Sequence, residues 1–384
     1  MTSKTMTGGQ AVVESLKVNE VDTVVGLIGS STLEILDALY DSKNIRYIGC
    51  HDERSGIIMT DAYARMKNKH GVFLAGQAGP GATNTVTGLA QAKAAFSPVV
   101  SLAGAISSEH EGKDAFQEVD QQSLFTPVTK KSFKISDTKD IHSVMQEAFK
   151  VAITPRMGPV NINLPRDVMG QTSDFQDPMK YQIEKLPEAK VSSLMKAVEL
   201  LTKAKNPVII VGAGIKNNLS HETVLALAEL IKAPCCTSPG HGDALPFEHP
   251  LNAGQMGPRG NIVASRLVKE ADVILVLGSR LGFNSTFYSY DNINKDASII
   301  HCEIDENSIG RYFPVEIGIF ADAKTVAEQL LTMLKSHQAK NEAQKWVDDF
   351  QAERKAYLEN RDQDADVTST PIQPSGLFKE LRQV

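Results

Sequence analysis

Two short polar segments carry the residue types that could do chemistry, and the first is Cys50-His51-Asp52-Glu53. It follows an apolar run at residues 46–49 and precedes a helical pattern. Open α/β sheets bind their ligands at the carboxyl ends of strands, so this position suits a binding or catalytic carboxylate. It equally suits a helix N-terminus, where Asp52 or Ser55 would cap the first turn and the helix dipole would favour Glu53. The residue types alone leave both interpretations open.

The second segment is the glycine-rich stretch Gly76-Gln77-Ala78-Gly79-Pro80-Gly81-Ala82-Thr83-Asn84. It links an apolar run at residues 71–75 to a helical pattern that continues to Ala95. Free backbone N–H groups and the helix dipole at such a turn can meet a polar or anionic ligand. The glycine spacing matches neither the dinucleotide fingerprint nor the P-loop. A ligand-binding turn and a tight structural connection are both compatible with it.

Other candidate sites have weaker patterns. Gly212-Ala213-Gly214 follows an apolar run, but Asn217 stands where a dinucleotide fingerprint needs its third glycine. The nine histidines show no H-x-x-x-H or H-E-x-x-H spacing, and the four cysteines show no C-x-x-C. The sequence therefore predicts no metal site, and no Ser-His-Asp or Cys-His set can be assembled from it.

The elements that must position these segments follow an alternating α/β pattern. Apolar periodicity predicts helices at residues 8–19, 32–42, 55–66 and 140–153, and strands at 23–27, 46–49, 71–75, 99–103 and 160–164. Residues 171–190 are polar, contain Pro178 and Pro187, and predict a linker. A second α/β unit has predicted helices at 192–203, 221–231, 262–270 and 323–334, and strands at 207–211, 234–237, 272–277 and 298–304.

These patterns predict an α/β protein with two doubly wound parallel-sheet domains, at residues 1–170 and 191–340. Residues 341–384 are charged and helical in pattern, and we expect them to form a helical connector. A length of 384 residues is too great for one compact core and fits two domains with a remainder.

Composition narrows the class of protein. Lys and Arg number 40 against 46 Asp and Glu, for a formal net charge of −6, and no long basic run occurs, so nucleic acid is not an expected partner. No stretch of 18 apolar residues occurs, and the first nine residues lack the apolar core of a signal peptide. Cysteines without a metal-site spacing suit a reducing compartment. We expect a cytoplasmic protein with no membrane partner.

Taken together, the motifs resemble the acetolactate synthase branch of the thiamine diphosphate enzymes. The resemblance rests on His51-Asp52-Glu53 with 61–65, on the turn at 79–84, on 114–118, on Gly158-Pro159-Val160 with 164–167, on 271–273, on Gly278-Ser279-Arg280 and on 301–305. Ile28-Gly29-Ser30, Gly76-Gln77, 116–121 and 161–167 are similar to sulfoacetaldehyde acetyltransferases. Acetolactate synthases usually carry Tyr-Pro-Gly-Gly where this chain has Leu27-Ile28-Gly29-Ser30, which leaves the substrate open.

The resemblance implies a layout as well as a reaction. Residues 1–170 would be the pyrimidine-binding domain and 191–340 a Rossmann-like central domain. The family's third domain, which carries the magnesium and diphosphate ligands, has no counterpart, because Gly242-Asp243-Ala244 lies in the wrong place. We expect the chain to be a portion of a homodimeric or homotetrameric enzyme, inactive alone, whose Mg²⁺ ligands lie in the missing domain. The enzyme would transfer a two-carbon unit from a pyruvate-like 2-oxo acid or from sulfoacetaldehyde. A non-catalytic nucleotide-binding or dimerising homologue is the alternative.

The resemblance also assigns roles to residues. Glu53 would hydrogen-bond the aminopyrimidine ring of thiamine diphosphate, since a partly desolvated carboxyl can share a proton with a ring nitrogen. Gln117 would face the reacting centre. The cofactor would contact Gly29, Ser30, Pro80, Gly81 and Asn84, and the substrate channel would include Phe116 and Lys130.

Acetolactate synthases also bind FAD, and this chain matches their flavin-contacting stretches at Arg156, Gly212, Gly214, Ser279, Arg280, Asp305 and Asp322. It departs from them at Gly282-Phe283-Asn284, where the family has Asp-Asp-Arg. The resemblance therefore admits FAD, an ADP site or a vestigial site.

Overall fold

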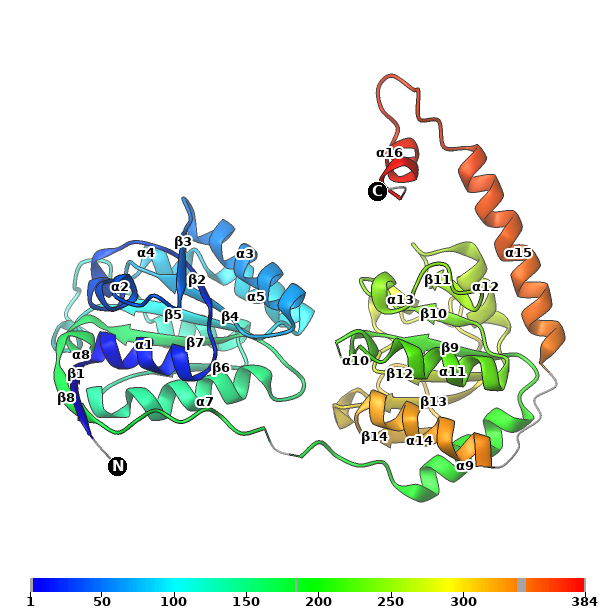
Figure 1. Cartoon of the computed structure of the whole chain (residues 1–384), viewed down its shortest axis with the longest axis horizontal. Helices are drawn as coiled ribbons and strands as arrows, with labels where there is room; N and C mark the ends of the chain where they lie inside the picture. The colour runs from blue at the N-terminus through cyan, green and yellow to red at the C-terminus, as the bar shows by residue number, and fades with distance from the viewer. Residues whose placement is uncertain (1–2, 184, 218, 337–342, 383–384) are drawn as a thin grey trace. The chain divides into compact units, whose positions relative to one another are not determined.

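The computed structural model describes residues 3–183, 185–217, 219–336 and 343–382. It divides into two compact units, Met1–Lys185 and Leu186–Val384. Each unit is a sheet covered by helices on both faces (Figure 1). The predicted fold class, two doubly wound α/β domains with parallel sheets, is confirmed.

The sheet of unit 1 has six parallel strands. They are β2 (Thr23–Leu27), β3 (Arg46–Gly49), β4 (Gly71–Ala75), β5 (Val99–Ala105), β6 (Lys131–Lys134) and β7 (Val160–Pro165). Their order across the sheet is β3-β2-β4-β5-β7-β6. The central strands β4 and β7 are buried along their whole length; β4 is a continuous apolar run, whereas β7 also buries Asn161 and Asn163.

Two helical layers enclose this sheet, and the two-residue period of the strands assigns side chains to each layer. Val72 and Leu74 of β4 join the core beneath α1 (Gly8–Val18), α2 (Leu33–Tyr40), α7 (Ile141–Ile153) and α8 (Arg166–Gly170). Phe73 and Ala75 join the opposite core, with α3 (Glu53–Lys67), α4 (Pro80–Thr83), α5 (Val86–Ala95) and α6 (Gln121–Phe125).

The structure differs from the predicted linker at its start. Strand β8 (Thr172–Phe175) pairs antiparallel with β1 (Lys4–Thr7), with Thr7 opposite Thr172 and Lys4 opposite Phe175. Both strands have four residues and are largely exposed, so neither carries the alternating apolar pattern that predicts a strand. The pairing closes unit 1 by joining its first residues to its last strand.

The topological switch point of unit 1 lies between β2 and β4, because the chain leaves β2 toward β3 and then crosses back to β4. Ligands of open α/β sheets bind at such points, outside the carboxyl ends of the strands. Here the two connections touch: a Cβ on Gly29 would lie 2.3 Å from the Gly76 carbonyl carbon. The glycines let the segments that follow β2 and β4 pass side by side.

Unit 2 is also a six-stranded parallel sheet. Its strands are β9 (Pro207–Val211), β10 (Cys235–Thr237), β11 (Asn252–Gln255), β12 (Val273–Leu277), β13 (Ser298–Glu303) and β14 (Ile317–Phe320). The order β11-β10-β9-β12-β13-β14 is that of dinucleotide-binding folds, with the switch point between β9 and β12.

The helices of unit 2 cover both faces of this sheet. One face carries α9 (Val191–Lys203), α11 (His221–Ile231) and α14 (Ala323–Ser336), and the other carries α12 (Ile262–Glu270) and α15 (Gln344–Gln363). The remaining helices are α10 (Ala213–Lys216), α13 (Phe283–Thr286) and α16 (Pro374–Leu381). None of the helices in the described part of the chain combines the length and apolar character needed to cross a membrane.

Helix α15 is the ordered core of the predicted connector. It is mostly charged, but Trp346, Val347 and Phe350 are buried, and the Trp346 indole N–H donates to the Pro207 carbonyl over 3.1 Å. Part of the predicted connector is therefore an integral helix of unit 2. Residues 341, 342, 383 and 384 of that prediction lie outside the described residues.

Candidate functional site

The two carboxylates at the start of α3 take different positions. Asp52 is the N-cap, and its side chain accepts a hydrogen bond from the Arg54 backbone N–H over 2.8 Å. Hydrogen bonds from the Arg54 side chain and backbone lower the pKa of Asp52 to about 2. Glu53 begins the helix, is only 7% exposed, and accepts through Oε2 from the Asn84 side-chain amide over 3.0 Å. The cap is therefore Asp52, which leaves Glu53 available for another task.

The glycine-rich turn fits between Glu53 and the backbone of a second loop. Gly79 has φ +66°, and a Cβ there would lie 2.3 Å from the Gln117 carbonyl oxygen. Pro80 begins the short helix α4, as its missing N–H allows. A Cβ on Gly81 would lie 3.3 Å from Glu53 Oε1. The glycines at 79 and 81 thus let the turn approach Gln117 on one side and the Glu53 carboxylate on the other.

A chain of amide contacts crosses the switch point. Gln77 Oε1 accepts from the Ser30 backbone N–H and from the Ser30 hydroxyl, each over 3.1 Å. Gln77 Nε2 donates to Gln117 Oε1 over 2.5 Å. Sequence reasoning gave Gln77 no role, although it stands inside the glycine-rich segment at the end of β4. The contacts join the ends of two strands to the loop that carries Gln117.

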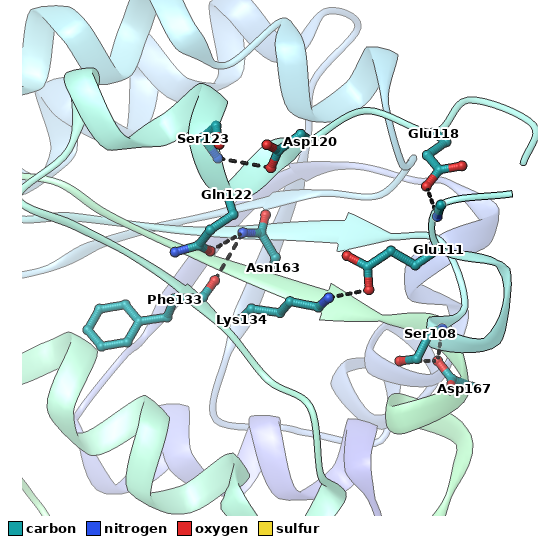
Figure 2. Close-up of polar contacts among 11 residues, drawn as sticks. Ser108, Glu111, Glu118, Asp120, Gln122, Ser123, Phe133, Lys134, Asn163 and Asp167 are labelled. Atoms are coloured by element: carbon teal, nitrogen blue, oxygen red, sulfur yellow. Dashed lines mark hydrogen bonds and ion pairs between the residues drawn. The ribbon is translucent and has the colours of Figure 1, made fainter. Parts of the chain in front are cut away.

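The loop before α6 is anchored by polar contacts along its length (Figure 2). The Glu118 carboxylate accepts from the backbone N–H of Gly112 over 2.5 Å and of Ala115 over 3.0 Å, which lowers the pKa of Glu118. Glu111 is ion-paired with Lys134 of β6. Gln117 itself has φ +64°, an uncommon conformation for a residue with a side chain. The loop therefore holds Gln117 in a defined and strained backbone position.

A buried network ties the turn to the sheet below it. Gln121, 6% exposed, accepts from the Gly79 backbone N–H over 3.2 Å and donates to Asn163 Oδ1 over 3.0 Å. Asn163 Nδ2 donates to the Phe133 carbonyl over 3.0 Å and to Gln122 Oε1 over 3.2 Å, as Figure 2 shows. Sequence reasoning missed these residues as well. The position of the turn is consequently fixed from β6 and β7.

The structure gathers the six residues predicted for thiamine diphosphate at this edge of unit 1, together with Gln117, which was predicted to face the reacting centre. The six are Gly29, Ser30, Glu53, Pro80, Gly81 and Asn84. Phe116 lies beside Gln117 on the loop and is 85% exposed. Lys130 instead donates to the carbonyls of Val151 and Thr154, over 2.6 and 2.7 Å, at the end of α7, and burial lowers its pKa to about 8. Its ammonium group is occupied as a helix C-cap.

The residues predicted for a flavin have local structural partners. Gly212 and Gly214 pack against Gly278, since a Cβ would lie 2.4 Å from the Gly278 carbonyl oxygen and 2.8 Å from the Gly278 Cα respectively. Asp305 caps the turn that follows β13, and Asp322 accepts from the Thr325 backbone N–H over 2.9 Å at the start of α14.

Two further flavin candidates, Ser279 and Arg280, directly follow Gly278, whereas Arg156 lies in unit 1 with its guanidinium 4.1 Å from the ring centroid of Phe96. These contacts account for the glycines and the two aspartates without a flavin. Among the described residues, no group of three or more His, Cys, Asp or Glu side chains is placed to hold a metal ion.

The Glu53 carboxylate, by contrast, keeps one oxygen available for a ligand. One carboxylate oxygen is held by Asn84, and the other, Oε1, has no hydrogen-bond partner among the residues that the structure describes. The missing Cβ at Gly81 leaves space beside that oxygen. That oxygen is not among the buried side-chain atoms left without a partner, so it can accept a hydrogen bond from a ligand.

Two known domain families match the chain. Residues 6–124 match "Thiamine pyrophosphate enzyme, N-terminal TPP binding domain" and residues 194–330 match "Thiamine pyrophosphate enzyme, central domain". The first match includes Glu53, the glycine-rich turn and Gln117, and the second covers most of unit 2.

Curated relatives carry related names. The chain is 34% identical over 386 residues to a probable acetolactate synthase large subunit of Methanocaldococcus jannaschii, covering 99% of this chain and 64% of the relative. It is 36% identical over 349 residues to the acetolactate synthase large subunit of Corynebacterium glutamicum, covering 89% and 55%. It is 35% identical over 331 residues to the sulfoacetaldehyde acetyltransferase of Rhodobacter capsulatus, covering 86% and 55%. The chain thus spans 55–64% of the length of these relatives.

Proposed function

Because this chain belongs to the thiamine pyrophosphate enzymes, of which it carries the N-terminal and central domains, we propose that it serves an enzyme of acetolactate synthase type. The enzyme would transfer a two-carbon unit from a 2-oxo acid such as pyruvate, with thiamine diphosphate held at the switch point of unit 1. The single observation that carries this proposal is the buried Glu53 carboxylate, whose Oε1 faces the space beside Gly81.

Each residue at this edge has a task in the proposal. Glu53 Oε1 would hold a proton shared with the aminopyrimidine ring, and Asn84 would keep the carboxylate oriented through Oε2. Gly81 would admit the ring to within hydrogen-bond reach, because no side chain blocks Oε1. When bound, thiamine diphosphate would supply a cationic ring that stabilises the negative charge left by decarboxylation. Gly29, Ser30 and Pro80 would line the same edge.

The binding of the diphosphate and Mg²⁺ is part of the proposal too. We assign it to a part of the enzyme other than these two units, and we expect residues 1–384 alone to bind the cofactor weakly and to be inactive. The family's arrangement makes a homodimer or homotetramer in the cytoplasm the expected form. Whether the protein binds a flavin is tested independently, by looking for flavin absorbance in the purified protein.

Replacement of Glu53 by Gln tests the proposal. In the magnesium- and cofactor-loaded holoenzyme, E53Q keeps the shape of the side chain but cannot take a proton. We expect turnover to be abolished and exchange of the cofactor C2 proton for deuterium, followed by NMR, to slow by at least about a hundredfold. Exchange at the wild-type rate in E53Q would refute the role of Glu53.

Sulfoacetaldehyde acetyltransferase is the second candidate activity. It is favoured by the 35% identity to the Rhodobacter capsulatus protein and by Gln77 within a turn that resembles that of such enzymes. Parallel assays with pyruvate and with sulfoacetaldehyde separate the two activities. The two-carbon unit is released by breaking a carbon–carbon bond in pyruvate and a carbon–sulfur bond in sulfoacetaldehyde.

A further inference from the structure

Gln77 is the central member of a chain of contacts whose hydrogen-bond polarity can be read without ambiguity. A backbone N–H can only donate, so the group of Gln77 that faces the Ser30 N–H, 3.1 Å away, must be its oxygen. The amide nitrogen then points the other way, to an acceptor 2.5 Å away on Gln117. That acceptor must be the Gln117 side-chain carbonyl oxygen. The fixed N–H of Ser30 thereby sets the orientation of both amides.

The orientation of its side-chain amide decides which hydrogen-bonding group of Gln117 is available to a ligand. Its Oε1 is occupied by Gln77, and its Nε2 has no hydrogen-bond partner among the residues of unit 1 that the structure describes. Its backbone is held by Gly79, which contacts the Gln117 carbonyl closely, and by the anchored loop. The hydrogen bond from Gln77 then sets which end of the Gln117 side-chain amide faces away from it. Gln117 is left with two N–H donors.

From this geometry we propose that Gln77 is a positioning residue that makes Gln117 a hydrogen-bond donor toward an oxygen of the 2-oxo acid substrate. The inference rests on the proposed function, since it takes the edge beside Glu53 as the place where the substrate reacts. In this proposal, Gln117 binds a carbonyl or carboxylate oxygen of the substrate. A substrate with a hydrogen-bond donor at that position would bind less well. Gln77 acts only through Gln117.

Replacement of Gln77 by Glu reverses the polarity with little change in shape. The carboxylate that Q77E introduces still accepts from Ser30, but toward Gln117 it can only accept. The Gln117 amide must then turn its N–H groups to residue 77 and present its oxygen to the substrate. In the holoenzyme we expect the KM for pyruvate to rise about tenfold with little change in kcat, the effect of losing one hydrogen bond to a charged group.

Acid should rescue this variant. When the new carboxyl group at position 77 takes a proton it can donate to Gln117 again, so the KM of Q77E should return toward the wild-type value as the pH falls. Asp52, Glu53 and Glu118 are carboxylates on the elements around the turn and are present in every variant, so the wild type is measured in parallel. Gln176→Glu adds the same charge at an exposed glutamine of unit 1 and should change neither KM nor its pH dependence.

Gln77→Met is the second variant, which removes both polar groups and leaves the Gln117 amide free to turn. We expect a KM increase of about threefold that acid does not reverse, with the fold checked by the thermal unfolding midpoint. A KM in Q77E no higher than in Q176E, or a Q77E defect that is independent of pH, would overturn the inference. Cofactor C2 exchange is measured in the same samples: its absence from the wild type would count against the proposed function, whereas normal exchange with an unchanged KM would count against Gln77 alone.

Discussion

Asp52 and Glu53 are neighbouring carboxylates with different environments because α3 begins between them. Asp52 has extended backbone angles, φ −157° and ψ 129°, and its oxygens turn to the first free N–H groups of the helix. Glu53 has entered the helix, and its side chain is carried to Asn84 and the glycine-rich turn. Two adjacent residues therefore differ in environment: Asp52 is a partly exposed helix cap and Glu53 is buried.

Replacement of Asn84 by Asp should expose how closely Glu53 depends on that partner. The change removes the N–H donor and sets a second carboxylate about 3 Å from Glu53 Oε2. Like charges at that distance cannot both remain ionised without a raised pKa. We expect cofactor C2 exchange in the holoenzyme to slow at least about tenfold at neutral pH. Asn84→Gln, which keeps the amide on a longer side chain, should lose less, and equal losses in the two variants would argue against a charge effect.

His70 should make unit 1 sensitive to mild acid. It is buried against Phe149 and Tyr181, its Nε2 lies 2.9 Å from the Phe149 carbonyl oxygen, and burial lowers its pKa to about 4 from 6.5. As the pH falls below 6.5 the unfolded chain takes up this proton first, so stability is lost between pH 6.5 and pH 4. The loss should approach about 3 kcal/mol.

Urea unfolding of wild type and His70→Gln across that pH range measures this contribution. The variant cannot titrate at position 70, so its free energy of unfolding should fall less steeply between pH 6.5 and pH 4. His110→Gln removes an exposed histidine and should leave the wild-type slope unchanged. If the free energy of unfolding has the same pH dependence in wild type and H70Q, then burial does not lower the pKa of His70.

At the scale of elements, the glycine-rich turn offers a matched pair of substitutions. Gly79 and Gly112 both have positive φ, +66° and +73°, but a Cβ at 79 would strike the Gln117 carbonyl whereas a Cβ at 112 would meet nothing within 4 Å. Gly112→Ala should therefore cost only the backbone strain, about 1 kcal/mol. Gly79→Ala should cost at least about 1 kcal/mol more, measured as the free energy of unfolding in urea. Equal costs would mean that the turn does not press on the loop.

Most strand positions that followed from the sequence are those of buried strands. The strands at 23–27, 46–49, 71–75 and 207–211 were predicted with the observed bounds, and three of these four are central in their sheets. The strands β6, β11 and β14 were not predicted. Each lies at the edge of a sheet, has four residues and includes polar residues or glycine, which leaves a weak apolar signal; the edge strand β3 has the same length and was predicted all the same.

The candidate site divided in the same way. Glu53, Asn84 and Gln117 were predicted from motifs that resemble a known family, and their roles stay predictions; the structure places them around the glycine-rich turn. Gln121 and Asn163 also lie in matching stretches, at 116–121 and 161–167, but their contact with each other could not be predicted, because only the fold brings a helix and a strand together. Lys130 was predicted from a motif position in the substrate channel. In the structure it hydrogen-bonds the free carbonyls at the end of α7, a local interaction that the motif does not indicate.

At the scale of the whole molecule, each unit has its own cores. Unit 1 has one on each face of its sheet, and unit 2 has another pair. Units with separate cores can unfold as separate cooperative blocks. The chain has one tryptophan, Trp346, which is buried in unit 2, so tryptophan fluorescence reports on that unit. Far-ultraviolet circular dichroism reports on both.

Two substitutions should therefore move different probes. Gly278→Ala in unit 2 places a Cβ 2.6 Å from the Gly214 Cα at φ +62°, and it should lower the urea midpoint seen by Trp346 fluorescence. Gly79→Ala in unit 1 should leave that midpoint unchanged while it adds an earlier transition to the circular dichroism signal. If Gly79→Ala shifts the urea midpoint of Trp346 fluorescence as much as Gly278→Ala does, then the two units unfold as a single cooperative block. Strain at the glycine-rich turn would then lower the stability of both units.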